Sequence, residues 1–334
     1  MKVIDHSVSG ETFALEYDDH YKLYRTTPIP ENLGSYYQSE AYISHTDGSK
    51  GLFEKLYQWI KHYTLQRKIR LVEQYVPQGK LLDIGAGTGD FVRTAKQRGW
   101  YATGVEPEAK ARDRAGEKGV FLYESQEQLT EKYDVITLWH VLEHIPQLKE
   151  QILFLKNHLE KEGLLVIAVP NYLSQDAQHY GPYWAAYDVP RHLWHFSQES
   201  IRLLFEEKGF ELIGVKPMPF DAFYVSLLSE KYKSGKMNFI KGFYHGLLSN
   251  LSALRTREYS SLIYLLKVKD KKLFHVEQLN YLSQYPVRCN KSYLKNIISQ
   301  CNVTRVRHKQ NYIFLPQIPR IFTERMIQQL SITP

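Results

Sequence analysis

Three glycines, Gly85, Gly87 and Gly89, stand at alternate positions between a short apolar run and a segment with helical spacing. Glycine permits a tight turn and lets a ligand approach the backbone where a Cβ atom would block it. The free N–H groups of the following helix then face that ligand. Asp83 precedes the turn, and Glu106 ends the next predicted strand, where a carboxylate can hold both hydroxyls of a ribose. The spacing therefore predicts a nucleoside site.

Two classes of cofactor use such a turn, and the acidic residues distinguish them. The dinucleotide fingerprint requires a glycine at position 90, which is Asp90 in this chain. A carboxylate beside the helix start is a poor neighbour for a pyrophosphate, and Asp83 suits a cationic amino group. A ligand with a ribose, an ammonium group and no phosphate is S-adenosylmethionine. The alternative, in which the glycines only make a tight turn, leaves the placement of Glu106 unexplained.

The same residues carry a resemblance to a known family. The segment Asp83–Gly89 resembles the first motif of class I S-adenosylmethionine-dependent methyltransferases, and Glu106 matches their ribose-binding acidic residue. The segment Tyr133–His144 is similar to their fourth strand and the turn after it. The resemblance covers roughly residues 75–268 and points to bacterial small-molecule enzymes related to ubiquinone-biosynthesis and sugar methyltransferases. It implies S-adenosylmethionine as the cofactor, and we expect these residues to bind it: Asp83, Gly85, Ala86, Gly87, Gly89, Glu106, Trp139 and His140.

Strands that alternate with helical segments must position these residues. This alternation predicts an α/β fold with a doubly wound, Rossmann-like sheet. The resemblance implies seven strands, mostly parallel, with an antiparallel last strand that Ser260–Val268 would supply. The other predicted strands are Lys80–Ile84, Tyr101–Val105, Val120–Tyr123, Tyr133–Trp139, Leu164–Val169 and Glu211–Lys216.

The chain divides into three predicted parts. Residues 1–50 form an N-terminal extension of short strands and turns. Residues 51–268 form the methyltransferase domain, which begins with amphipathic helices up to Val76 and contains a helical insertion at Asp221–Leu254. Residues 269–334 form a basic C-terminal extension.

The segment His140–His144 also matches the His-x-x-Glu-His pattern of zinc metalloproteases. That pattern needs a long helix, and Pro146 interrupts it within two residues. We therefore predict no metal, and interpret Trp139 and His140 as neighbours of the cofactor. His144 either caps the turn or faces the methyl acceptor.

The long loop that follows the fifth strand is a second candidate site, because acceptors dock in such loops at the carboxyl edge of the sheet. Its rings Tyr183, Trp184 and Tyr187 are predicted to bind substrate. His192 and His195, like His144, are candidate bases for a hydroxyl acceptor. The alternative is a packed loop in which the histidines satisfy backbone groups.

Charge and composition bound the remaining choices. The net charge of +7 resides in the tail, since residues 1–269 carry equal numbers of basic and acidic side chains. The two cysteines, Cys289 and Cys301, indicate no disulfide framework, and no secretory signal or long apolar run is visible, which favours a cytoplasmic protein that does not span a membrane. The expected function is methyl transfer to a small molecule. The alternatives are an RNA or protein methyltransferase that uses the basic tail, and a non-catalytic scaffold that binds the cofactor.

Overall fold

The structure, a computed structural model, describes residues 1–37 and 52–269. Met1–Asp270 form one compact unit. The predicted C-terminal extension, with both cysteines, lies outside the described residues apart from Lys269. Within the described ranges, no helix combines the length and the apolar character that crossing a membrane requires.

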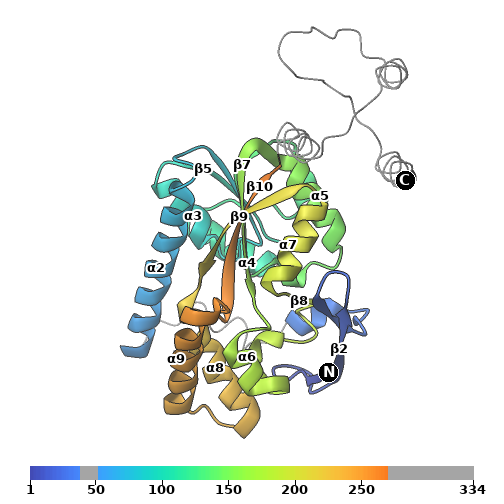
Figure 1. The fold of residues 1–334 in the computed structure, drawn as a ribbon. Helices are drawn as coiled ribbons and strands as arrows, with labels where there is room; N and C mark the ends of the chain where they lie inside the picture. The colour runs from blue at the N-terminus through green and yellow to red at the C-terminus, as the bar shows by residue number, and fades with distance from the viewer. Residues whose placement is uncertain (38–51, 270–334) are drawn as a thin grey trace, which may run out of the picture. The chain divides into compact units, whose positions relative to one another are not determined.

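A six-stranded sheet forms the centre of this unit, in the order β5-β4-β6-β7-β10-β9. β10 runs antiparallel to both of its neighbours, whereas the pairs between β5, β4, β6 and β7 are parallel. The predicted doubly wound α/β fold with an antiparallel last strand is therefore confirmed (Figure 1). The strands are β4 (Lys80–Ile84), β5 (Tyr101–Val105), β6 (Tyr133–Trp139), β7 (Leu159–Pro170), β9 (Phe210–Pro217) and β10 (Ser261–Val268).

The predicted seventh strand, Val120–Tyr123, is reduced to a single parallel bridge between Tyr123 and Val105. The bridge consists of two hydrogen bonds of 2.9 Å, in which the Glu106 N–H donates to the Tyr123 carbonyl and the Tyr123 N–H donates to the Gly104 carbonyl. The chain leaves the sheet because Ser125 caps the short helix η2 (Gln126–Gln128) immediately afterwards. The strand count of seven is thus corrected to six.

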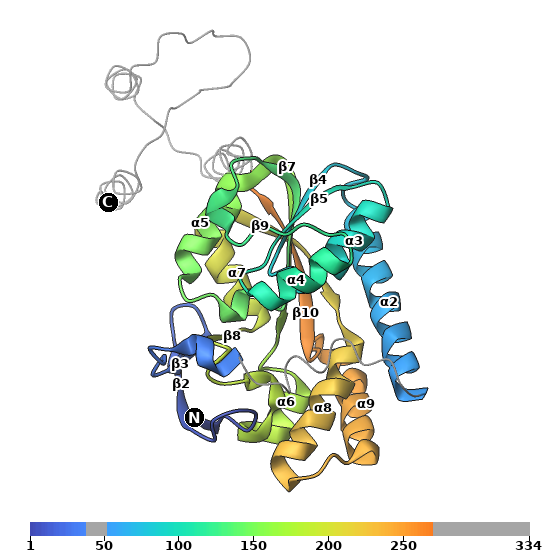
Figure 2. The same ribbon diagram turned by 180° about the vertical axis from the view of Figure 1, so that it is seen from behind.

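Helices cover both faces of the sheet because neighbouring strand residues point to opposite sides. Leu81 packs in the cluster under one set of helices, and Leu82 packs in the cluster under the other. Figures 1 and 2 show the two layers. The first layer contains α2 (Leu52–Glu73), α3 (Asp90–Gln97) and α4 (Ala109–Glu117), and the second contains α5 (Leu148–His158) and α7 (Gln198–Glu207).

The N-terminal extension forms a second, four-stranded antiparallel sheet with a segment far away in the sequence. β3 pairs with β8, which lies in the loop after β7. Arg191 in that loop also donates to the carbonyl of Tyr36 (3.1 Å) and to the hydroxyl of Ser7 (2.7 Å). The first 37 residues are therefore held against the predicted acceptor loop by strand pairing and by hydrogen bonds. The elements are β1 (Lys2–Ile4), β2 (Thr12–Asp18), β3 (Leu23–Thr27), η1 (Leu33–Tyr37) and β8 (Trp194–His195).

The predicted helical insertion is a hairpin of α8 (Pro219–Ser234) and α9 (Phe239–Thr256). It packs with α6 (Gln175–Tyr180) beyond the carboxyl ends of the parallel strands, at the lower end of the views in Figures 1 and 2. The fully buried Asp176 joins these pieces, because it accepts from Ser249 on α9 (2.6 Å) and from Ser260 before β10 (2.7 Å). Three short helices complete the fold: η3 (Leu142–His144), η4 (Gly181–Tyr183) and η5 (Ala185–Tyr187).

Candidate active site

The glycine turn joins β4 to α3, and its three glycines have φ angles of 69°, 53° and 73°. All three angles lie in the left-handed region that favours glycine. A Cβ atom on Gly85 would overlap the side chain of Val141, and one on Gly89 would lie 3.1 Å from Ala115 and Val120. A Cβ on Gly87 would meet nothing within 4 Å. Two glycines therefore serve packing, and Gly87 leaves its side of the turn open to a ligand.

Glu106 lies against this open side of the turn. Its Oε2 atom accepts from the Gly87 N–H over 2.8 Å, and its Oε1 atom accepts from the Glu108 N–H over 3.0 Å. Burial raises the pKa of the Glu106 carboxyl, against the lowering effect of these two hydrogen bonds. Each oxygen keeps capacity to accept a further hydrogen bond, which suits the two hydroxyls of a ribose.

Asp83 lies at the end of β4 and is 2% exposed. The Thr137 hydroxyl donates to its Oδ1 atom over 2.6 Å. Burial raises the pKa of Asp83 to about 7, against the lowering effects of that hydrogen bond and of the Lys68 charge. A cationic ammonium group bound beside Asp83 would favour the ionised carboxylate.

Asp90, at the start of α3, does not present an unpaired charge to a ligand. Its carboxylate forms ion pairs with Lys61 (2.7 Å) and Lys118 (3.1 Å). The sequence argument that Asp90 would repel a pyrophosphate is therefore wrong, since two lysines compensate its charge. The dinucleotide fingerprint requires its third glycine at position 90, and the absence of a glycine there still separates this turn from that class.

Lys68, on α2, is a site residue that the sequence reasoning missed. Its ammonium group lies 4.4 Å from the ring centre of Trp139, one of the predicted cofactor neighbours. Burial lowers the pKa of Lys68, and the charges of Asp221 and Asp83 oppose that effect. Its place in the site depends on the packing of α2 on the sheet, which also buries the adjacent Ile69.

His140 follows β6 with a φ of 57° and is held between two carboxylates. Its Nε2 atom lies 3.1 Å from Asp221 Oδ2, and its Nδ1 atom lies 3.4 Å from Glu143 Oε1. Burial lowers the pKa of His140, but the hydrogen bonds to Asp221 and Glu143 outweigh it and raise the value to about 9. His140 is therefore a cation at neutral pH, and its predicted place beside the cofactor stays a prediction.

Glu143, His144 and His192 lie together beyond β6, with one ligand atom of each within 4.8 Å of the others. Glu143 is fully buried, and the two imidazole rings meet edge to face at 4.6 Å. Burial and the neighbouring His192 lower the pKa of His144 to about 4, so this ring is neutral at pH 7. The three side chains can accept a proton from a substrate or hold a divalent cation.

The backbone fixes the tautomers of the two rings. The Nδ1 atom of His144 lies 3.0 Å from the Arg191 carbonyl, and that of His192 lies 2.8 Å from the Ala186 carbonyl. A carbonyl only accepts, so the Nδ1 atom of each ring is the donor in these two contacts. The metalloprotease geometry is not formed, because His140 binds Asp221 and residues Leu142–His144 form one short helical turn.

His195 is not placed to act on a substrate. It is 4% exposed in β8, and its Nε2 atom lies 2.9 Å from the hydroxyl of Thr26. Burial lowers its pKa well below the ordinary value. Its burial and its contact with Thr26 favour a packing role, in which His195 joins β8 to the N-terminal sheet, over the predicted role of a base.

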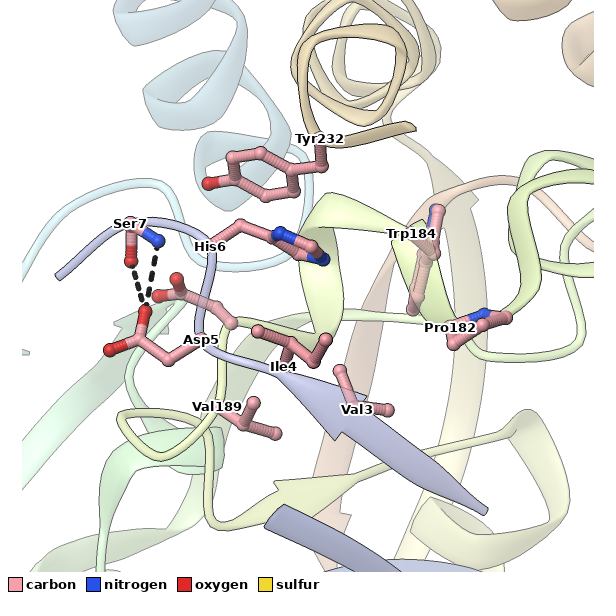
Figure 3. Close-up of a pocket in the computed structure, with 10 residues that line it drawn as sticks. Val3, Ile4, Asp5, His6, Ser7, Pro182, Trp184, Val189 and Tyr232 are labelled. Atoms are coloured by element: carbon pink, nitrogen blue, oxygen red, sulfur yellow. Dashed lines mark hydrogen bonds between the residues drawn. The ribbon is translucent and has the colours of Figure 1, made fainter. Parts of the chain in front are cut away.

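The predicted substrate rings lie at the contact with the N-terminal extension. Trp184 and Tyr187 are 2% and 5% exposed, and the Trp184 indole donates to Asp176 over 2.8 Å. Tyr183 is more exposed and stacks on His6 at 5.6 Å. Figure 3 shows the small pocket there, with Trp184 and His6 among its lining residues. The burial of Trp184 and Tyr187 favours a packing role for both over the predicted contact with an acceptor.

Comparison with known proteins agrees with this geometry. Residues 57–215 match the family model described as a methyltransferase domain. The ubiquinone biosynthesis O-methyltransferase of Aeromonas salmonicida is 37% identical over 78 residues, which cover 20% of this chain and 33% of that protein. The enzyme of the same name from Glaesserella parasuis is 34% identical over 107 residues, with 28% of this chain and 45% of that protein covered. The chain thus spans less than half the length of these relatives.

Solved structures with a similar backbone are more distant in sequence. The magnesium protoporphyrin IX methyltransferase of Synechocystis with bound S-adenosylhomocysteine is 17% identical, with a TM-score of 0.46 over 71% of this chain and 97% of that chain. A S-adenosylmethionine-dependent methyltransferase from Archaeoglobus fulgidus is 16% identical, with a TM-score of 0.43 over 62% and 93%. Neither likeness identifies an acceptor for the present chain.

Proposed function

Because the chain belongs to the class I S-adenosylmethionine-dependent methyltransferases, we propose that it transfers a methyl group to a hydroxyl group of a small molecule. S-adenosylmethionine supplies the methyl group on a sulfonium centre. The residues of the chain bind and orient both reactants for an in-line displacement and accept the proton that the hydroxyl loses.

The observation that carries the proposal is the open side of Gly87, which two carboxylates flank. Glu106 offers acceptors for the ribose hydroxyls, and Asp83 offers a buried carboxylate for the ammonium group. Lys68, whose ammonium group lies 4.4 Å from the ring centre of Trp139, offers a cation for the carboxylate of the methionine part. The ribose hydroxyls, the ammonium group and the carboxylate of the ligand thus each find a complementary group.

The buried cluster of Glu143, His144 and His192 supports a hydroxyl acceptor. A hydroxyl must lose its proton as it attacks, and the neutral His144 ring, with His192 beside it, can take it. Glu143 then stabilises the imidazolium that forms. The two relatives above carry names that specify an O-methyltransferase, which favours oxygen over nitrogen or carbon as the methylated atom.

Calorimetric titration with S-adenosylmethionine, S-adenosylhomocysteine and NAD tests cofactor binding. We expect the two sulfur ligands to bind and NAD not to bind. Gly87→Val should abolish binding, because its side chain fills the open side of the turn. Gly10→Val is the matched control, since Gly10 also has a positive φ of 72° with nothing within 4 Å. A folded wild-type protein that binds neither sulfur ligand would overturn the proposal.

A labelled-methyl assay then tests the acceptor class. The purified chain is incubated with S-adenosylmethionine labelled in the methyl group and with a panel of phenols, amines and sugars. Transfer to phenol or sugar hydroxyls supports the proposal. Transfer to amines alone, or cofactor binding without transfer to any compound, would contradict it and favour an N-methyltransferase or a non-catalytic scaffold, respectively.

A further inference from the structure

The helix α9 (Phe239–Thr256) is packed in an unusual sense, with its smallest residues inside and its largest apolar residues outside. The residues that it buries are Gly242, Gly246, Ser249 and Ala253. A Cβ atom on Gly246 would lie 2.8 Å from the Cα of Phe223, so α8 and α9 touch backbone to backbone. An ordinary surface helix buries its large apolar side chains instead.

The exposed residues form one continuous apolar stripe. Six large apolar residues of α9 are exposed, and at 3.6 residues per turn their positions fall within an arc of roughly 100° on the helix surface. Ile240 is 84% exposed, and the other five are between 40% and 61% exposed. Among the described residues, α6 and α8 pack on the opposite side of the helix and leave the stripe uncovered. We call these residues the α9 stripe: Ile240, Phe243, Tyr244, Leu247, Leu251 and Leu254.

The exposed charges of the α8–α9 hairpin have a single sign. Within the hairpin, from Pro219 to Arg257, both acidic side chains are withdrawn from the surface, because Asp221 pairs with His140 and Glu230 is buried. Every exposed charge on the hairpin is therefore basic, and none of these charges forms an ion pair with the described residues. The basic residues are Lys231, Lys233, Lys236, Lys241, Arg255 and Arg257.

We propose that the α8–α9 hairpin docks on an anionic lipid surface, with the α9 stripe in the interface and the basic side chains against the headgroups. An exposed apolar stripe on a hairpin whose exposed charges are all basic is the pattern of a helix that lies in the plane of a membrane surface. The helix does not span the bilayer. It binds at the surface of the bilayer.

Charge disfavours two other partners that could cover the stripe, namely the C-terminal segment of this chain and a second copy of the chain. The C-terminal segment from Asp270 onward carries ten basic and three acidic residues, so a basic hairpin would repel it. A second copy of the chain would bring the same basic border against itself. An anionic surface alone satisfies both the apolar stripe and its border.

The hairpin connects this surface to the candidate active site. Asp221, in the first turn of α8, holds the Nε2 atom of His140 at 3.1 Å. The hairpin lies beyond the carboxyl ends of the parallel strands, where the glycine turn also lies (Figure 2). Docking would therefore bring that end of the molecule to the lipid surface. The inference does not depend on the proposed function, because its readout is binding.

Sedimentation with vesicles tests the inference on the full chain. Vesicles of phosphatidylcholine with phosphatidylglycerol are compared with vesicles of phosphatidylcholine alone. We expect the wild type to bind the anionic vesicles at least about tenfold more tightly, and to lose this preference at high salt. Replacing Ile240, Leu247 and Leu251 together by Ser should weaken binding by at least about tenfold, since these side chains enter the interface.

Two controls distinguish docking through the α9 stripe from nonspecific adsorption of exposed apolar side chains and from unfolding. Tyr101→Ser with Leu153→Ser removes apolar side chains that are 79% and 55% exposed elsewhere, and should leave vesicle binding unchanged. Thermal denaturation checks that each variant folds. Equal binding of wild type and triple variant would overturn the proposal. So would a dimer in analytical ultracentrifugation that the triple variant converts to monomer while neither protein binds vesicles, because a second copy would then cover the stripe.

Discussion

The Nε2 atom of His140 lies 3.1 Å from the Oδ2 atom of Asp221, although the loop after β7, α7 and β9 separate the two residues in the sequence. His140 ends the strand beside the glycine turn, and Asp221 begins the helical hairpin. Glu143 lies 3.4 Å from the other ring nitrogen. One imidazolium thus ties the predicted insertion to the cofactor end of the sheet.

This pair makes stability depend on pH in a defined direction. The folded pKa of His140, about 9, exceeds the ordinary value of 6.5, so its stabilisation is fully present below pH 6.5 and is lost as the pH rises through about 9. Asp221→Asn should lower the free energy of unfolding at neutral pH by roughly 2 kcal/mol and flatten this dependence. Urea denaturation across the range measures it. The exposed Asp113→Asn serves as control, and an unchanged pH profile in Asp221→Asn would contradict the pairing.

Cofactor affinity should rise with pH because of Asp83. Its pKa of about 7 leaves the buried carboxyl partly protonated at neutral pH, and a cationic ammonium group requires the ionised form. The affinity for S-adenosylmethionine should increase as the pH passes through about 7, and Asp83→Asn should remove this increase and weaken binding by about tenfold to hundredfold above it. Calorimetry measures both effects. Adenosine, which has no ammonium group, is the control ligand, and an identical pH dependence for both ligands would refute the role of Asp83.

Glu106→Gln should weaken cofactor binding without unfolding the turn. The Gln side chain can still accept from the Gly87 N–H, but it loses the charge that strengthens hydrogen bonds to ribose hydroxyls. We expect a loss of affinity of about tenfold, measured by calorimetry. Glu108→Gln, two residues further along and exposed, should bind as the wild type does. Unchanged binding by Glu106→Gln would remove the ribose assignment.

The two histidines beyond β6 should matter for turnover, and His195 should not. With a hydroxyl acceptor, His192→Gln and His144→Gln should each lower kcat by about a hundredfold to ten thousandfold while cofactor affinity stays within about twofold. His195→Gln is the matched control from the same loop, since its ring faces Thr26. Steady-state kinetics at saturating acceptor concentration compares kcat of the three variants. A loss of kcat that appears only in His195→Gln would contradict the assignment, and sensitivity of kcat to a chelator would indicate that the cluster holds a divalent cation.

Two glycine-to-alanine changes should move stability in opposite directions. In α9, Gly246→Ala places a methyl group 2.8 Å from the Phe223 Cα and should lower the free energy of unfolding by about 1–3 kcal/mol. In α4, Gly116 has nothing within 4 Å of its Cβ position, and Gly116→Ala should raise stability by about 0.5–1 kcal/mol through helix propensity. Thermal denaturation checks both. Stabilisation by Gly246→Ala would show that the helices pack less closely than the structure indicates.

Local sequence patterns predicted the strands and the glycine turn well. Largely apolar runs mark β4, β6 and the second half of β7, because strands buried on both faces favour apolar residues at most positions. The turn could be predicted because a left-handed φ next to a ligand restricts the residue to glycine. The helical insertion was also visible, since helical periodicity is a property of neighbouring residues.

The sequence by itself therefore determined the fold class, the cofactor turn and the nature of the cofactor, because each rests on residues close together in the chain. Only the tertiary structure decided which histidines face each other, which are buried against the N-terminal strands, and that Lys68 and Asp221 join the site. It also decided that α9 turns its large side chains outward. These facts depend on contacts between residues that are distant in the chain, and a residue type with its local spacing carries no record of such a partner.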